Sequence, residues 1–484
     1  MVTLEPSGTA SVETLTRAVI AVVVDVLQVL DVDAHDDLNA LCTEMREAQG
    51  IATLLNQWLG STLTVRQLIR ERTPARLAAA LVADGVLPPK AVQVRESAAH
   101  GLDDDDIRTA SWRNFWETTY RFSSQKQNDD LDTAGWLDKS TLSALPEPYM
   151  QEWVDSTVNR IRPLAHDKVL DVGCGVGLIL LQLAPECARY VGVDFSEEAV
   201  RRVLGRTGSS QRYSSVEVVR AEAHHAAQLA QGEFDLVLLN SVIQYFPDTG
   251  YLKKVLADLM GSLCPGGAIF LGDVRNRDMH DALHTSLVAE KLPDSTPTAQ
   301  ARRSVDRSMT VDAPLLLSPS ELVSLVKDLG IDASCRVQVR RGVFPTEMNR
   351  FRYDALIVPG GHSVPAAVPE VPWKEIYTAG SAGETIASVL ERAEENLVIR
   401  SAPDARTYAT SRLARALNAV SAGTTMGQVR GNLISAAAVD PERVWQLGHE
   451  RGFGVAVAPG QEIGHVDMAF WRGHDDWATA DLLD

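Results

Sequence analysis

The sequence VLDVGCGVG combines one carboxylate with a run of alternating glycines. Asp171 is followed by Gly173, Gly175 and Gly177, and the helical stretch LILLQLA comes next. Glycine lets the chain turn tightly and brings backbone N–H groups close to a ligand at the start of a helix. Asp194 lies near the end of the next apolar run, YVGVDFS, where an acidic residue suits the hydroxyls of a ribose. The spacing therefore predicts a site for a ligand that contains a nucleoside.

The carboxylate of Asp171 separates two kinds of nucleoside ligand. It lies two residues before Gly173, where it would repel the pyrophosphate of a dinucleotide but would attract an amino group. A ligand with an amino group and no phosphate is therefore favoured over a dinucleotide. The remaining alternative is a glycine turn that only packs a helix against a sheet.

Short apolar runs alternate with helical stretches in the middle of the chain. The runs are KVLDVG, RYVGVDFS, VEVVRAEA, FDLVLLNS, GGAIFLGDV, RVQVRR and YDALIVPG. Such alternation is typical of parallel strands that are joined by crossover helices. We therefore expect an α/β fold with a doubly wound sheet whose last pair of strands is antiparallel.

A chain of 484 residues is too long for a single hydrophobic core, so we expect several domains. The sequence divides into segments that differ in their hydrophobic periodicity. Residues 1–90 show helical periodicity broken by turn residues, which predicts a small helical bundle. Residues 91–110 include an acidic run, DDDD, and predict a linker in which this run is solvated or caps a helix rather than binding a cation. Residues 111–360 carry the predicted sheet. Residues 361–484 alternate helix and strand again and predict an α+β appendage.

The composition excludes some classes of partner. A formal net charge of −18 without a basic stripe argues against nucleic acid. The most apolar stretch, AVIAVVVDVLQVL, is short and contains Asp25, so we expect no membrane span and a cytoplasmic protein. The five cysteines are scattered and lack paired spacings, which predicts free thiols and no metal site.

The pattern Asp-x-Gly-x-Gly-x-Gly resembles the first motif of class I S-adenosylmethionine methyltransferases, which are Rossmann-like doubly wound domains. Their cofactor, S-adenosylmethionine, carries a methionine ammonium and no phosphate. By this resemblance Asp171 and the glycines face the methionine part, and Asp194 faces the ribose. Phe195 then faces the adenine ring, and Glu222 with Ala223 faces its amino edge.

Other motifs resemble the N-methyltransferase domains that are embedded in nonribosomal peptide synthetases. These motifs are LLNSVIQYFPDTGYL, AGW, MQEWVDSTVNRI, GDVR and TEMNRFRYD, and the similarity covers about residues 111–475. The first motif contains Asn240 and Ser241, which the resemblance adds to the cofactor site. Thr346 stands where the family has asparagine, and Asn349 stands where it has a hydroxyl residue. These departures lie on the acceptor side and imply an unusual substrate.

The resemblance implies methyl transfer by direct displacement, which needs positioning but no metal. Glu347 is the first candidate for orienting an amine and accepting its proton, and the alternative is an ion pair with Arg350 or Arg352 in a solvent-facing turn. His284, on the helix after GDVR, is a second candidate for the base, with a packing or surface role as its alternative. Tyr245 would orient the acceptor or line the sulfonium, with a core aromatic as the alternative.

The helical stretches before residue 86 resemble an acyl or peptidyl carrier protein that lacks its phosphopantetheine serine. The Leu-Gly-Gly-Asp-Ser pattern of such carriers best matches LCTEM, which ends at Met45, and no serine lies between Ser11 and Ser61. This pseudo-carrier domain would be unable to hold a substrate. It would dock where a true carrier docks or cover the active-site cleft, or it is a relic of gene fusion that stabilises the fold.

Three hypotheses follow for the whole chain. Because no adenylation, condensation or thioesterase motif surrounds the methyltransferase-like region, the first is a free-standing, trans-acting methyltransferase of nonribosomal peptide and antibiotic biosynthesis. It would methylate the amine of an aminoacyl or peptidyl thioester presented by the carrier protein of an assembly line. The second hypothesis moves the acceptor to oxygen or carbon on a tethered or free intermediate. The third is a non-catalytic scaffold that brings partners together.

Overall fold

The structure of the chain is a computed structural model. It describes residues 145–483 apart from 209, 230–231, 312–313, 361–367, 394–395, 420–422, 432, 434–436 and 474, residues 32–86 apart from 43–44 and 60, and scattered positions within 12–23 and 112–144. The chain divides into two compact units. The first holds residues 1–124, 134–144 and 306–313, and the second holds residues 125–133, 145–305 and 314–484.

The first unit is helical in its best-described part. Its helices there are α2 (Leu38–Leu41), α3 (Met45–Leu59), α4 (Val65–Glu71) and α5 (Pro74–Ala83). Thr64 forms a capping box with Gln67 at the start of α4, and Thr73 caps α5 ahead of Pro74. The apolar faces meet in a core that includes Leu38, Leu55, Leu68, Leu77 and Leu81. A small helical bundle is therefore observed, while its resemblance to a carrier protein stays a prediction.

A seven-stranded sheet forms the centre of the second unit, in the order β3-β2-β1-β4-β5-β7-β6. Its strands are β1 (Lys168–Val172), β2 (Arg189–Asp194), β3 (Val216–Arg220), β4 (Phe234–Asn240), β5 (Leu263–Arg275), β6 (Ala333–Val339) and β7 (Arg352–Pro359). Strands β1 to β5 are parallel, and β7 runs antiparallel to both β5 and β6. The predicted doubly wound α/β sheet with an antiparallel last pair is confirmed.

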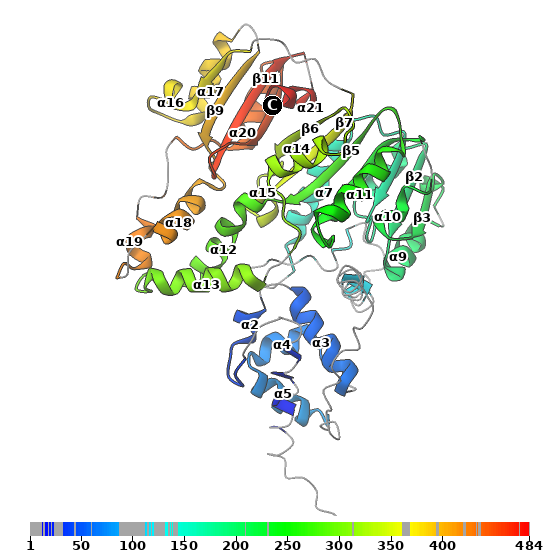
Figure 1. Cartoon of the computed structure of the whole chain (residues 1–484), viewed down its shortest axis with the longest axis vertical. Helices are drawn as coiled ribbons and strands as arrows, with labels where there is room; N and C mark the ends of the chain where they lie inside the picture. The colour runs from blue at the N-terminus through cyan, green and yellow to red at the C-terminus, as the bar shows by residue number, and fades with distance from the viewer. Residues whose placement is uncertain are drawn as a thin grey trace, which may run out of the picture. The chain divides into compact units, whose positions relative to one another are not determined.

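Helices cover the sheet, which explains why its inner strands are nearly continuous apolar runs. The helices around it are α7 (Glu147–Ile161), α8 (Leu180–Leu183), α9 (Glu197–Thr207), α10 (Ala223–Ala226), α11 (Thr249–Met260), α12 (His280–Ala289), α14 (Pro319–Lys327) and α15 (Glu347–Phe351), and α13 (Thr298–Val311) is divided between the two units after Val305. Strand residues such as Leu170 and Val237 share a core with the apolar faces of α11 and α14. Figure 1 shows α9 and α10 beside β2 and β3, and α14 beside β6. No helix in the described part of the chain is long and apolar enough to cross a membrane.

The helix after the glycine run is shorter than the stretch LILLQLA suggests. Residues up to Ile179 form turns, α8 spans only Leu180–Leu183, and a 3-10 turn follows at Ala184–Glu186. Gly177 has a positive φ of 87°, which delays the start of the helix. Pro185 lacks the N–H group that would continue α8.

A second sheet accounts for the C-terminal part of the same unit, in the order β10-β11-β9-β8. Its strands are β8 (Glu370–Pro372), β9 (Leu397–Pro403), β10 (Phe453–Pro459) and β11 (His465–Arg472), and its helices are α16 (Trp373–Ile376), α17 (Ala382–Arg392), α18 (Tyr408–Ala419), α19 (Met426–Arg430), α20 (Pro441–His449) and α21 (Asp476–Thr479). This α+β appendage packs on the first sheet: the Trp477 indole donates to the carbonyl of Arg160 at 3.1 Å, and the Gln338 amide donates to the carbonyl of Asp476 at 2.7 Å.

Candidate active site

The strand order of the large sheet reverses between β1 and β4. The chain passes from β1 to β2 on one side and later returns to β4 on the other. In doubly wound sheets a crevice opens at such a point, outside the carboxyl ends of the strands. The cofactor residues that the sequence predicts lie at the carboxyl ends of β1, β2 and β4 or in the segments that follow β1, β2, β3 and β4.

The glycine run forms a compact loop after β1. Gly173, Gly175 and Gly177 have φ values of 78°, 53° and 87°, a region that side chains other than glycine rarely adopt. The N–H groups of Gly173 and Cys174 both donate to the carbonyl of Val193, at 2.7 and 3.0 Å. A Cβ on Gly173 would lie 2.4 Å from Val242, so the loop also requires glycine for its contact with the segment after β4.

Asp194 fastens the glycine loop to the end of β2. One carboxylate oxygen accepts the Gly175 N–H at 2.9 Å, and the other accepts the Ser196 N–H at 2.8 Å. A carboxylate has about four lone-pair sites, so it can accept from the backbone and from a ligand at the same time. The pairing of Gly175 with Asp194, nineteen positions apart, brings together the two motifs from which the site was predicted.

Asp171 is a buried carboxylate whose partner the sequence did not reveal. Its side chain accepts a hydrogen bond from the Tyr190 hydroxyl at 2.9 Å and is only 4% exposed. Burial raises the pKa of Asp171 to about 7, and the nearby charge of Asp194 adds to this effect, although the Tyr190 hydrogen bond opposes it. Asp171 has no cationic side chain as a partner in the described part of the chain. A ligand with a positive charge would therefore stabilise its ionised form.

Replacing Asp171 by asparagine should change the pH dependence of stability. The pKa of this aspartate is about 7 in the folded chain against an ordinary value of 3.8, so the folded state binds more protons between these values, and stability falls as the pH rises through that window. Asp171→Asn should remove this loss and raise the free energy of unfolding at about pH 8 by up to roughly 4 kcal/mol. Denaturant titrations of the ligand-free protein at about pH 5 and pH 8 measure it. A gain that is equal at both pH values would contradict the burial of an ionisable group.

The ends of β4 and β5 are joined by a tight polar contact. Ser241 and Asp273 both have positive φ values, 57° and 60°, although neither is glycine, and the Ser241 hydroxyl donates to the Asp273 carboxylate. Such backbone strain is concentrated at functional sites. Asn240 Oδ1 is buried and has no hydrogen-bond partner among the described residues. A Cβ on Gly272 would lie 2.0 Å from that oxygen, so glycine is required there.

The predicted adenine residues lie on the segments that follow β2 and β3. Phe195 comes directly after Asp194 and is half-buried. Glu222 is the N-cap of α10, with its carboxylate 3.5 Å from the His224 ring, and Ala223 is the first residue of the helix. The Ala221 N–H donates to the carbonyl of Asp194 at 3.0 Å, which holds this segment beside β2.

Glu347 is the first residue of α15 and forms an ion pair with Arg352. Its carboxylate accepts from the Arg352 guanidinium, with Nε at 3.0 Å, and its side chain is 17% exposed. The pair named as an alternative role therefore exists, but it lies largely inside the molecule rather than in a solvent-facing turn. Thr346 caps α15 by accepting the Asn349 N–H at 3.2 Å, so both departures from the family pattern serve local structure.

Arg352 also links the predicted acceptor side to the cofactor side. One terminal nitrogen of its guanidinium donates to Glu347, and the other donates to Asp273 at 2.6 Å. Because Ser241 donates to Asp273, a continuous chain of polar contacts runs from Ser241 to Glu347. Asp273 is fully buried. Register explains the contact, because Arg352 on β7 lies opposite Arg275 on β5, two residues beyond Asp273.

Two further arginines complete a buried charge network that the sequence did not predict. Arg340 donates to Asp354 at 2.8 Å and lies 3.4 Å from Asp273, and Arg160 lies 3.5 Å from Asp354. Asp354 also accepts the N–H of Asp273 at 2.8 Å. Removing one member would leave a buried charge uncompensated, which typically costs about 3 to 5 kcal/mol.

The other two catalytic candidates, Tyr245 and His284, differ in how far they are buried. Tyr245 ends a 3-10 turn, Ile243–Tyr245, directly after Ser241 and is half-buried rather than part of the core. His284 lies on α12, is 1% exposed and meets the His280 ring edge-on at 4.5 Å. This burial favours the packing alternative for His284. No group of three or more potential metal ligands is arranged for a metal ion in the part of the chain that the structure describes.

Comparisons with known proteins converge on this region. Residues 170–271 match the family model described as "Methyltransferase domain". The chondramide synthase cmdD of Chondromyces crocatus is 31% identical over 286 residues, which cover 59% of this chain and 7% of that protein. The probable non-canonical nonribosomal peptide synthetase CymA of Salinispora arenicola is 29% identical over 272 residues, which cover 56% of this chain and 3% of that protein. The chain thus spans a small fraction of the synthetases that it matches.

A solved structure with a related description also aligns with part of the chain. The magnesium protoporphyrin IX methyltransferase of Synechocystis PCC 6803, with bound SAM, is 16% identical. The alignment covers 54% of this chain and 99% of that one, with a TM-score of 0.34.

Proposed function

We propose that this chain, which carries an S-adenosylmethionine-dependent methyltransferase domain related to those of nonribosomal peptide synthetases, methylates the amine of a carrier-tethered aminoacyl or peptidyl thioester. The observation that carries the proposal is the polar chain from Ser241 through Asp273 and Arg352 to Glu347. It connects a carboxylate that would suit an amine, through Arg352 and Asp273, with the segment that follows β4. Cofactor and acceptor would therefore meet at one edge of the sheet.

The residues present fit S-adenosylmethionine. Asp171 is a buried carboxylate with a raised pKa and would gain a cationic partner in the methionine ammonium. Asn240 Oδ1 is a buried acceptor without a partner among the described residues, and it suits a donor on the same group. The carboxylate of Asp194, at the end of β2, suits the ribose hydroxyls, and Phe195 with the Glu222 segment would border the adenine.

When bound, S-adenosylmethionine supplies an electrophilic methyl group on a sulfonium. The chain's contribution is positioning, because displacement needs the amine in line with the breaking bond. An α-amine has an ordinary pKa of about 7.7 to 8.0, so much of it is neutral near that pH and a strong base is unnecessary. Glu347, which pairs with Arg352, accepts a hydrogen bond from the amine and orients its lone pair.

A direct assay tests this function. The full chain is incubated with S-adenosylmethionine and with carrier proteins loaded with different aminoacyl groups, and the products are analysed by mass spectrometry with fragmentation. Gain of one methyl group on nitrogen of the tethered residue supports the proposal. Methylation on oxygen or carbon would replace it by the second hypothesis. Absence of cofactor binding in a calorimetric titration would replace it by the scaffold.

The first unit would serve this function as a docking piece for the assembly line. Helix α3 begins at Met45, the position that carries the modified serine in the carrier proteins that this segment resembles. We propose that the domain keeps the shape of a carrier protein but lacks the serine nucleophile. It would then bind the surfaces of the assembly line that true carrier proteins bind. The relic alternative predicts no effect of the domain on turnover of tethered substrates.

Because position 45 has no hydroxyl group, we expect that the chain cannot be modified with phosphopantetheine there. A phosphopantetheinyl transferase uses a serine oxygen as nucleophile, and methionine has none, so incubation with coenzyme A and a broad-specificity transferase should leave the intact mass unchanged. A genuine carrier protein in the same reaction is the control. An added phosphopantetheine group on this chain would refute the pseudo-carrier assignment.

A further inference from the structure

We propose that Glu152, Arg406 and Glu442 are positioning residues that hold the loop between β6 and α15 and thereby place Glu347 against the acceptor. This loop, Arg340–Thr346, leads directly into α15, and the inference rests on the proposed function of Glu347. Glu152 comes from α7, and the other two residues come from the appendage. The appendage would accordingly belong to the acceptor site.

Arg406 donates hydrogen bonds to the backbone of the loop and to the backbone of α15. Its guanidinium donates to the carbonyls of Arg340 and Gly342, each at 2.6 Å, and to the carbonyl of Asn349 at 3.4 Å. In return, the carbonyl of Arg406 accepts from the Arg350 guanidinium at 3.0 Å. The contacts join the first part of the loop to α15, so they set the position of the helix that begins with Glu347.

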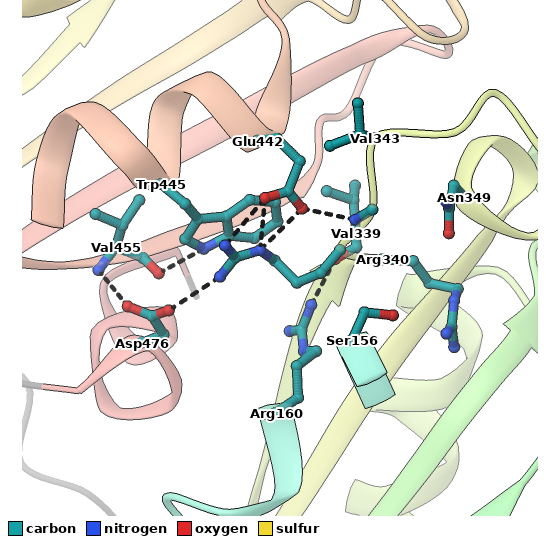
Figure 2. A network of polar contacts seen from close by, with 12 residues as sticks. Ser156, Arg160, Val339, Arg340, Val343, Asn349, Glu442, Trp445, Val455 and Asp476 are labelled. Atoms are coloured by element: carbon teal, nitrogen blue, oxygen red, sulfur yellow. Dashed lines mark hydrogen bonds and ion pairs between the residues drawn. The ribbon is translucent and has the colours of Figure 1, made fainter. Parts of the chain in front are cut away.

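Glu442 of α20 holds the first part of the loop. Its carboxylate accepts the Gly342 N–H at 2.6 Å and two nitrogens of the Arg341 guanidinium, at 2.9 and 3.0 Å. The Arg341 guanidinium also lies 4.3 Å from the centre of the Trp445 ring and 3.6 Å from Asp476. Figure 2 shows this arrangement, with Glu442 pointing from α20 toward the loop.

Glu152 holds the second part from the opposite side. Its two oxygens accept the N–H groups of Val343 and Phe344, at 2.8 and 3.0 Å, and one of them also accepts the Asn349 amide at 3.1 Å. Gly342 has φ of 141°, and a Cβ there would lie 2.2 Å from the Asn349 side chain. The loop therefore passes between two carboxylates and an arginine with no room to shift toward α15.

These contacts bear on the reaction rather than on cofactor binding. The loop forms part of the wall of a groove of about 800 Å³ along α7, and neither the glycine loop nor Asp194 lines that groove. A displacement of about 1 Å in a group that positions a reactant costs on the order of 100-fold in rate. Loosening the loop should consequently lower turnover while leaving the affinity for S-adenosylmethionine intact.

The test compares Arg406→Met and Arg406→Lys with a matched control, Arg415→Met. Arg415 lies on α18, is about half exposed and pairs with Glu462, away from the loop. In the full chain we expect Arg406→Met to lower kcat for a loaded carrier at least about 10-fold, with the Kd of S-adenosylmethionine changed less than about 2-fold. Arg406→Lys should recover part of the loss, and Arg415→Met should match the wild type.

A double variant and hydrogen exchange distinguish positioning from general destabilisation. If Arg406 acts through Glu347, Arg406→Met should cost far less in a Glu347→Gln background than in the wild type. Amide exchange should accelerate at residues 341–350 and not in the glycine loop. Equal losses in both backgrounds, or unchanged exchange in the loop, would overturn the inference. A wild-type chain that binds S-adenosylmethionine but methylates no carrier would overturn the proposed function instead, and the exchange result would still decide the positioning role.

Discussion

Asp194→Ala should weaken the binding of S-adenosylmethionine by about 100-fold or more. The substitution removes charge-assisted hydrogen bonds to the ribose, each worth about 1.5 to 3 kcal/mol. It also removes the acceptors of the Gly175 and Ser196 N–H groups, so the glycine loop loses its attachment to β2. Isothermal titration calorimetry of the folded variant measures the change in Kd.

Two additional variants distinguish the loss of cofactor contacts from a general loss of folding. Asp194→Asn retains an acceptor oxygen for the loop but lacks the charge, so it should fold and still bind more weakly than the wild type. Glu217→Gln removes an exposed carboxylate on β3 that pairs with Arg189, and it should leave the Kd unchanged. An unaltered Kd in both Asp194 variants would place the cofactor elsewhere.

Glu347→Gln should reduce kcat for a tethered amine by about 100-fold, with little change in cofactor affinity. Glutamine keeps the size of the side chain but loses the anion that Arg352 holds and that orients the amine. Single-turnover methylation of a loaded carrier measures the chemical step, and calorimetry measures the cofactor separately.

The control for this prediction is Glu391→Gln, which removes an exposed carboxylate that pairs with Arg451 in the appendage. It should show wild-type kcat. Parallel losses of kcat and cofactor affinity in Glu347→Gln would assign Glu347 a structural role in the buried charge network instead. A normal kcat would instead favour Tyr245, which lies in the segment after β4, as the residue that orients the acceptor.

The cofactor half of the site was predictable because its signals are local. Asp171 and Asp194 lie at or near the ends of two strands and the glycines follow the first of them, and apolar runs of strand length mark where those strands end. Parallel strands then bring their carboxyl ends to one edge without further information. The helix after the glycine loop was overestimated, because its apolar stretch is periodic enough for a helix but is interrupted by left-handed Gly177 and by Pro185.

The acceptor half, and the partner of Asp171 in the cofactor half, depend on register and on distant segments, which no local pattern encodes. Tyr190 reaches Asp171 only because Tyr190 pairs with Val169 and so lies diagonally across two parallel strands from Asp171. Arg352 reaches Asp273 through the antiparallel pairing of β5 and β7. Glu442 lies 100 residues from the glycine whose N–H it accepts. The sequence therefore suggested Glu347 as a candidate and Arg352 as a possible partner, but not the contacts of Asp273 and Glu442.

The contacts of α21 have a consequence for the order of events during synthesis. The Trp477 indole bonds to a carbonyl 317 residues earlier in the chain, and the carbonyl of Asp476 bonds to Gln338, 138 residues earlier. Both ends of these bonds must be outside the ribosome before they form. The helical first unit can fold before α21 has been synthesised, but the contacts that close the second unit around α7 and β6 form only after α21 has emerged, and the surfaces that α21 covers stay exposed until then.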